Sequence, residues 1–180
     1  MRLPSVKKLF KDTGLSWLWL TILFLIIDQV TKQWVANTFD YRETLAVFPF
    51  FNLTYVHNPG AAFSFLADQG GWQRWFFTAI ASIASIVFIV WMAKTPKQQS
   101  LLCISFAFIL SGALGNLIDR AMFGYVIDFL DFYWGDKHFA AFNVADSAIF
   151  VGAALMIFES FTNKESSKEN KTNNSNKAES

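Results

Sequence analysis

The 180-residue sequence has little cysteine and little charge. Its single cysteine, Cys103, excludes an intrachain disulfide framework and is most simply a small packed residue. No basic stretch interleaved with aromatic residues marks a nucleic-acid surface, which excludes nucleic acid as a partner. Charged residues make up 16% of the chain and apolar residues 53%, with a mean hydropathy of +0.31. This composition is too apolar for an ordinary soluble domain and favours a membrane protein.

Patterns typical of metal, serine or cysteine hydrolases are also absent. His57 and His138 belong to no set of His, Cys and Glu with zinc-ligand spacing, so the sequence predicts no metal and no cofactor. Cys103 lies about 20 Å or more from either histidine by helix rise, too far for a cysteine nucleophile. A serine triad would have to use Ser111 or Ser147, and neither is accompanied by a nucleophile-elbow pattern.

Four apolar stretches are long enough to cross a bilayer, whose hydrocarbon core of about 30 Å needs about 20 helical residues. The N-terminal stretch begins like a secretory signal peptide, but no small-residue cleavage site follows it, so we expect it to be retained. The sequence therefore predicts an all-α membrane protein with one transmembrane domain over residues 1–162. The predicted spans are residues 15–35, 72–92, 101–118 and 144–161.

The segments between the spans are predicted to lie outside the bilayer. Residues 39–71 carry an aromatic and β-branched run, FPFFNLTYV (48–56), followed by the turn-forming HNPG (57–60). With AAFSFL (61–66) as the return strand, this segment would form a small extracytoplasmic β-hairpin, rich in Phe where it rests on lipid or substrate. Residues 121–142 are expected to form an outer loop.

The distribution of Lys and Arg predicts the orientation. Four basic residues precede the first span, two lie in the link 93–100 and four lie beyond residue 162, whereas five are spread over the rest of the chain. By the positive-inside tendency, both termini and this link are cytoplasmic and the other loops face outward. Residues 163–180 lack aromatic residues and are rich in Lys, Glu, Asn and Ser, which predicts a disordered polar cytoplasmic tail.

Acidic residues on three predicted spans reach one depth. With a rise of about 1.5 Å per residue, Asp28, Asp119 and Asp146 lie about 25 to 30 Å from the cytoplasmic ends of their spans. Asn116 lies about one helical turn before Asp119, and Asn143 one turn before Asp146, so each pair shares a face. Because ionisable groups in a bilayer are costly and typically functional, we predict one shared site in the outer leaflet.

Asp128 and Asp146 are the carboxylates that we expect to carry chemistry. Two carboxylates a few Å apart cannot both ionise cheaply, so one keeps a proton while the other takes a proton from a bridging water. That water would attack a peptide carbonyl, while the protonated acid stabilises the oxyanion and helps the nitrogen leave. The alternative is that one or both aspartates only solvate helix ends.

Two further charged pairs have structural alternatives. Asp28 and Lys32 are four residues apart with the acid first, which favours an ion pair. A structural role is preferred for this pair, because pairing neutralises two charges that are costly in the bilayer. Asp119 would bond to a neighbour while Arg120 holds backbone carbonyls of a bound chain. For these two, structural and substrate-holding roles fit equally well.

Five motifs in this chain resemble signature blocks of the lipoprotein signal peptidase family, bacterial signal peptidase II. They occur in the family's order and extend from the first predicted span to the last. Ser111 stands where a glycine is frequent, a small departure because serine is also small. The motifs are DQVTK (28–32), HNPGAAF (57–63), SGALGNLIDR (111–120), VIDFLDF (126–132) and FNVADSAI (142–149).

This resemblance implies a four-helix aspartic endopeptidase of the bacterial inner membrane. It would cut a prolipoprotein just before the diacylglyceryl-modified cysteine, with Asp128 and Asp146 as the catalytic pair. The outer hairpin would correspond to a periplasmic cradle, and residues 122–138 would include a mobile flap. We expect a monomer in contact with membrane lipid. The positions that line the family's site are Asn58, Asn116, Arg120 and Asn143, and those that hold it together are Asp28, Lys32 and Asp119.

Two other functions fit a small membrane protein with buried acids. A proton-coupled transporter would distribute carboxylates through the membrane depth, whereas the inner halves of the predicted spans lack acids apart from Glu159. A non-enzymatic membrane scaffold would lose little when single acids are replaced.

Overall fold

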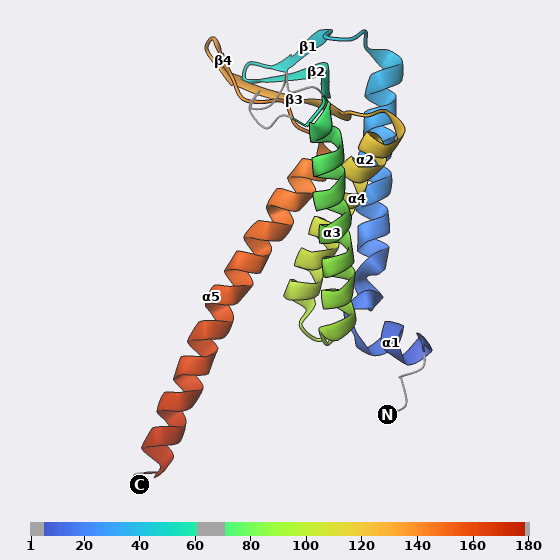
Figure 1. The fold of residues 1–180 in the computed structure, drawn as a ribbon. Helices are drawn as coiled ribbons and strands as arrows, with labels where there is room; N and C mark the ends of the chain where they lie inside the picture. The colour runs from blue at the N-terminus through green and yellow to red at the C-terminus, as the bar shows by residue number, and fades with distance from the viewer. Residues whose placement is uncertain (1–5, 61–70, 179–180) are drawn as a thin grey trace.

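The protein is represented by a computed structural model that describes the backbone of residues 6–60 and 71–178 and side chains within residues 8–60 and 71–162. In these parts of the chain, four helices are long and apolar enough to span a membrane, which confirms the predicted fold class. The helices stand alongside one another, with a small sheet at one end (Figure 1). The spans are Gly14–Thr38, made of a short 3-10 helix and α2 (Leu18–Thr38), α3 (Trp72–Lys94), α4 (Ser100–Met122) and the first part of α5 (Val144–Ala178).

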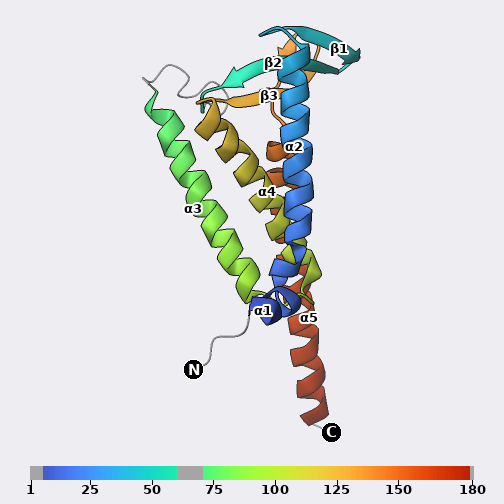
Figure 2. The same cartoon turned by 90° about the vertical axis from the view of Figure 1, so that its right-hand side faces the viewer.

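Helix α4 is the centre of the bundle. Its apolar stretch is 61% buried, whereas the corresponding stretches of the other three spans are 11% to 22% buried. In Figure 2, α4 lies between α2 and α3. The outer helices keep many large apolar side chains exposed, including Ile22 and Val30 of α2 and Ile83 and Ile86 of α3. Such continuous apolar faces suit lipid rather than water as the surrounding solvent.

Two glycines of α4 allow the neighbouring helices to approach closely. A Cβ atom on Gly112 would collide with the carbonyl oxygen of Ala145 in α5. A Cβ atom on Gly115 would collide with the carboxylate of Asp28 in α2. Both glycines belong to the SGALGNLIDR motif, so this stretch of α4 brings the polar residues of three helices together.

Apolar side chains form one cluster at each end of the bundle. The cluster away from the sheet contains Leu15, Met92 and Phe106, and Cys103 is buried near it, as expected for a packed cysteine. A second cluster joins α2 to the sheet and is built from Val35, Phe39, Tyr55, Ile127 and Phe129. This second cluster anchors the sheet on the helices.

The sheet is antiparallel and has four strands in the order β1-β2-β3-β4. The strands are β1 (Thr44–Phe48), β2 (Phe51–Asn58), β3 (Val126–Trp134) and β4 (Lys137–His138). The predicted strand 48–56 is largely confirmed as β2, but its hairpin partner is β1, which precedes it. Strand β2 also pairs with β3 on its other side. AAFSFL itself lies outside the described residues.

Strand β3 lies in a segment for which the sequence predicted an outer loop. VIDFLDF pairs with β2, so that Asp128 is opposite Val56 and Asp131 opposite Asn52. Two aspartates stand among the apolar residues of this segment. In the fold both are buried and hydrogen-bonded, which removes the usual cost of a carboxylate in a strand. A mobile flap in this region stays a prediction.

The two ends of the chain also differ from a plain four-span pattern. A short helix, α1 (Val6–Asp12), lies across the end of the bundle opposite the sheet (Figure 1). Helix α5 continues to Ala178, past the other helices, where the sequence predicted a disordered tail (Figure 2). Extending an existing helix adds a hydrogen bond per residue without a new nucleation cost, which explains how a polar segment can continue the helix.

Candidate active site

The start of α5 is held by a reciprocal cap between Asn143 and Asp146. The side-chain oxygen of Asn143 accepts a hydrogen bond from the backbone N–H of Asp146 at 2.9 Å. In return, Oδ2 of Asp146 accepts the backbone N–H of Asn143 at 3.2 Å. This arrangement follows the capping-box pattern, in which the first residue and the one three positions later satisfy each other's N–H groups. The sequence FNVADS thus positions the Asp146 carboxylate through local structure.

The side-chain amide of Asn143 also reaches the second carboxylate. Its Nδ2 donates to Oδ1 of Asp128 at 2.7 Å and lies 3.2 Å from Oδ1 of Asn116. Asn116 in turn donates from Nδ2 to Oδ1 of Asp146 at 2.8 Å. Asp128 and Asp146, from a strand and a helix, therefore share one hydrogen-bonded network through two asparagines, and the polar stripes of α4 and α5 face each other as predicted.

Asp128 is 2% exposed and lies on β3 beneath the sheet. Asn58 donates from Nδ2 to Oδ2 of Asp128 at 2.9 Å, and its own Oδ1 accepts the N–H of Gly60 at 2.9 Å, which orients the amide. Burial raises the pKa of the Asp128 carboxyl to about 7, and the charge of Asp146 adds to this rise. The hydrogen bonds from the two asparagines and the positive charge of Lys32 act in the opposite direction.

Lys32 is completely buried between two aspartates. Its Nζ lies 2.9 Å from Asp28 and 3.0 Å from Asp119, and donates to Oδ1 of Asn116 at 3.0 Å. The predicted Asp28–Lys32 ion pair is thus confirmed, and the third partner, Asp119, comes from α4. Such a cluster compensates charges that would be very costly if buried alone.

The same two aspartates connect this cluster to the chain around Asp128 and Asp146. Oδ1 of Asp28 accepts the backbone N–H of Ala145, in the first turn of α5, at 2.8 Å. Oδ2 of Asp119 accepts the N–H of Ile127, the residue before Asp128, at 3.2 Å. The ion cluster therefore anchors the backbone beside both carboxylates.

Arg120 lies at the edge of the network. Its guanidinium lies over the ring of Phe77 at 5.4 Å and donates to the carbonyl oxygen of Asn116 at 3.3 Å. Asp146 and Asp128 attract its charge. Its buried Nε has no hydrogen-bond partner within the described part of the chain.

Two contributing residues were missed by sequence reasoning. Gln29 donates from Nε2 to Asp119 at 2.9 Å and to Asp28 at 3.2 Å, so it supports the ion cluster. Arg74 of α3 donates to the carbonyl oxygens of Arg120 and Ala121 at 2.9 and 3.1 Å, which caps the end of α4. The available signals were a polar residue inside a predicted span and a lone arginine near the start of another.

The residues considered for other chemistries are engaged elsewhere. The Ser111 hydroxyl donates to the carbonyl oxygen of Phe108 in its own helix at 2.7 Å, and the Ser147 hydroxyl donates to that of Asn143, just before its helix, at 2.9 Å. His57 stacks on Tyr125 with ring centroids 3.7 Å apart. His138 contacts Asp131 in the sheet, away from both serines. These contacts give no support to a serine triad.

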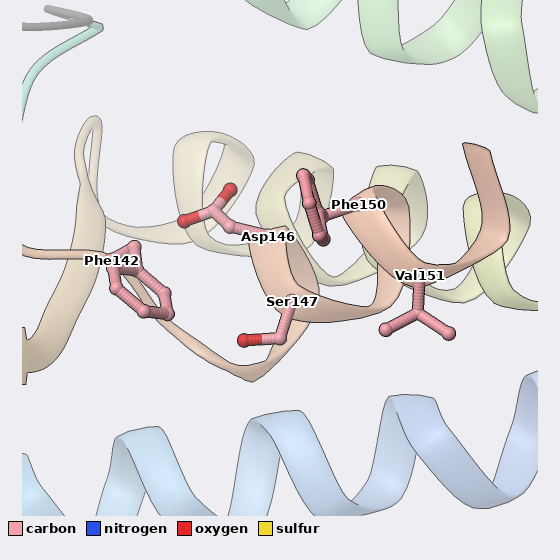
Figure 3. Close-up of a pocket in the computed structure, with 5 residues that line it drawn as sticks. All are labelled: Phe142, Asp146, Ser147, Phe150 and Val151. Carbon is pink, nitrogen blue, oxygen red and sulfur yellow. The ribbon is translucent and has the colours of Figure 1, made fainter. Parts of the chain in front are cut away.

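Three cavities reach Asp146. One, of about 410 Å³, is lined by Phe142, Asp146, Ser147, Phe150 and Val151. Figure 3 shows Asp146 and Phe150 on one side of α5 and Ser147 and Val151 on the other. A cavity of about 440 Å³ beneath the sheet is lined by Asn58, Phe132, residues 139–142 and Asp146. The third, of about 280 Å³, is bounded by α3, α4 and α5 and includes Asn116, Arg120 and Asp146 in its lining.

Comparison with known proteins agrees with the geometry. Residues 20–162 match the family described as signal peptidase (SPase) II, Peptidase A8. The lipoprotein signal peptidase of Alteromonas mediterranea is 53% identical over 96% of this chain and 97% of its own length. That of Shewanella sediminis is 51% identical over 94% of this chain and 96% of its own.

A solved structure shows the same fold. It is a bacterial membrane enzyme determined by the in meso method at 2.3 Å resolution. It is 32% identical to this chain, with a TM-score of 0.72, and the match covers 81% of this chain and 87% of that one. The chain therefore belongs to the lipoprotein signal peptidase family, the aspartic-type signal peptidases II of bacterial membranes.

Proposed function

We propose that this peptidase removes the signal peptide of diacylglyceryl-modified prolipoproteins by cleaving on the N-terminal side of the lipidated cysteine, with Asp128 and Asp146 as the catalytic pair. The observation that carries the proposal is that Asn143 contacts both aspartates. Its side-chain NH2 group donates to Asp128, its side-chain oxygen accepts the backbone N–H of Asp146, and its backbone N–H donates to the Asp146 carboxylate. Membership of the lipoprotein signal peptidase family supports the substrate class.

Asp146 is proposed to act as the base. Its two oxygens accept hydrogen bonds from the side chain of Asn116 and from the backbone N–H of Asn143, which orient the carboxylate. Asp128, with its pKa raised to about 7, holds a proton at neutral pH in much of the population. The two environments thus separate the roles of base and acid.

The proposed reaction then follows in two steps. A water gives a proton to Asp146 while its oxygen attacks the carbonyl carbon before the cysteine, and the Asp128 hydroxyl hydrogen-bonds to the developing oxyanion. Collapse of the tetrahedral intermediate breaks the carbon–nitrogen bond. A proton from the aspartate pair goes to the leaving amine of the cysteine, so the products are a carboxylate and a free amino terminus.

The cavities support a substrate with several apolar parts. In a lipidated precursor the cysteine carries acyl chains, an apolar segment of the signal peptide precedes it, and the mature chain follows it. Three mainly apolar cavities extend from Asp146 in different directions. The cavity lined by Phe77 and Ile80 of α3 and Ile149 of α5 favours a lateral entrance between these helices. Acyl chains could then remain in the bilayer during cleavage.

The distribution of charge supports the proposed topology. Helix α1 and the link 93–100 between α3 and α4 lie at the end of the bundle opposite the sheet (Figure 1). They carry the exposed lysines Lys8 and Lys11, and Lys94 and Lys97, respectively. By the positive-inside tendency this end is cytoplasmic, which puts both termini there and the sheet with Asp128 on the outer side.

The rival function, proton-coupled transport, is less well supported. A proton relay needs titratable groups spaced through the bilayer. In the described spans, Asp28, Asp119 and Asp146 instead gather at one end, and the fourth acidic residue of these spans, Glu159, lies toward the other end. This grouping suits a reaction site in one leaflet.

The proposal is tested with purified full-length protein and a synthetic precursor peptide, with and without the diacylglyceryl group on its cysteine. We expect cleavage before the modified cysteine, much slower cleavage of the unmodified peptide, and no cleavage by Asp128→Asn or Asp146→Asn. Cleavage by either variant, in a preparation free of unsubstituted enzyme, would reject the catalytic pair. Equal rates on both peptides would reject the lipidated substrate class.

A further inference from the structure

We propose that Asp131 and His138 are positioning residues, whose contact sets the register in which residues 137–142 return along β3 and thereby places Asn143 against Asp128. The register itself is a property of the fold. Its effect on cleavage rests on the proposed function.

Asp131 is a buried carboxylate outside the proposed catalytic network. It lies three residues after Asp128 on β3 and is 5% exposed. Its oxygens lie 2.9 and 3.0 Å from Nδ1 of His138, and they accept hydrogen bonds from Asn52 at 3.1 Å and Thr54 at 3.3 Å. Since a buried carboxylate is costly unless it is paired, this cluster makes the β3–β4 contact specific.

The chain leaving β4 runs back along β3 toward the site. His138 is opposite Tyr133, and the two rings stack with centroids 5.2 Å apart. Four residues later, Phe142 exchanges backbone hydrogen bonds of 2.8 and 3.1 Å with Leu130. These four residues run beside three residues of β3, so the return segment contains one extra residue between the two contacts. Asn143 follows directly, so the alignment at His138 reaches the residue that contacts both aspartates through a short segment of fixed length.

A slip of this segment would dismantle the site. Strand β4 has two residues, so its backbone ladder alone specifies the register weakly. Moving an extended segment by one residue shifts it by about 3.3 Å and reverses the side of every side chain. Such a shift would separate the amide of Asn143 from Asp128, which are 2.7 Å apart. Hydrogen bonds from Asn52 and Thr54 of β2 hold the Asp131 carboxylate in place, so this carboxylate determines where the His138 ring must lie.

The test compares His138→Ala, His138→Asn and, as a control, Lys137→Ala at the neighbouring exposed position. Asparagine keeps a donor near the place of Nδ1, and the His138 side chain is 53% exposed, so neither replacement empties the core. The measurements are backbone hydrogen exchange at Phe139 and Phe142, and kcat and KM on the diacylated precursor.

For His138→Ala we expect exchange at these amides to rise and kcat to fall, each by roughly three- to tenfold, as the loss of one ordinary, partly exposed hydrogen bond implies. KM should change less than kcat, because Asn143 acts on the reacting groups. His138→Asn should restore most of the exchange protection and most of kcat. Lys137→Ala should match the unsubstituted protein in both measurements.

Unchanged exchange in His138→Ala would overturn the proposed register role. Faster exchange with unchanged kcat would overturn the positioning role, and so would equal losses in the Ala and Asn variants. Exchange is measured without substrate. Failure of the unsubstituted protein to cleave the precursor would therefore reject the proposed function while the exchange result still decides the register.

Discussion

Asn143 and Asp146 satisfy each other's backbone N–H groups at the start of α5, at 2.9 and 3.2 Å. The proposed catalytic base is therefore also part of a helix cap. The two roles make different demands on the side chain, because a cap needs an acceptor oxygen whereas a base needs a group that can take a proton.

Replacing Asp146 separates these roles. Asp146→Asn keeps an acceptor for the N–H of Asn143, so it should lose cleavage with little loss of thermal stability. Asp146→Ala should lose cleavage and also about 0.5–2 kcal/mol of unfolding free energy, the usual value of a cap. Cleavage of the diacylated precursor and thermal unfolding measure the two effects. Ser147→Ala is the control, and activity surviving in Asp146→Asn would exclude Asp146 as the base.

Asp28→Asn should destabilise the protein. It leaves Lys32 buried with one fewer negative partner, and breaking a buried ion pair costs about 3–5 kcal/mol. Thermal unfolding of the purified protein should show a lower midpoint, with cleavage retained at temperatures where the variant is folded. Asp40→Asn, at an exposed acid, should change neither property. An unchanged unfolding midpoint with cleavage lost would instead assign Asp28 to the chemistry.

The raised pKa of Asp128 predicts how stability and rate depend on pH. Its carboxyl has a pKa of about 7 in the folded protein, above the value of 3.8 that it has when exposed. The folded state therefore binds the proton more tightly, so this contribution to stability is complete below the lower value and is lost as pH rises toward 7. Cleavage should also decline above pH 7, where the acid is ionised.

The comparison with Asp128→Asn isolates this group. The variant should lose the part of the pH dependence of its unfolding temperature that lies between about pH 4 and 7, because its amide does not titrate. A cleavage rate of the unsubstituted protein that increases steadily from pH 7 to 9 would contradict the role of protonated Asp128.

Gly112→Ala should separate α5 from α4. The added methyl group would overlap the carbonyl oxygen of Ala145, next to Asp146, and overpacking of this kind typically costs about 1–3 kcal/mol. We expect a lower unfolding temperature and reduced kcat. Ser111→Ala removes a hydroxyl bonded to its own helix and should behave like the unsubstituted protein. Full activity in Gly112→Ala would show that this close approach is not needed.

Sequence by itself determined the four spans and the depth of their acids. Both depend on local properties: apolar runs of sufficient length, and a regular helical rise that puts Asp28, Asp119 and Asp146 at a common level. The Asp28–Lys32 pair followed from spacing on one helix. For the same reason, the FNVADS segment already contained the cap that orients Asp146.

Only the tertiary structure decided where Asp128 lies and what surrounds it. VIDFLDF lies in the predicted outer loop 121–142, yet it forms β3, since its carboxylates are satisfied by partners from β2, from β4 and from Asn143 at the start of α5. The third partner of Lys32, the pairing of β2 with β1, and the contact of Asn143 with Asp128 join segments distant in the chain. Such contacts depend on the free energy of the whole packed arrangement, which local patterns do not contain.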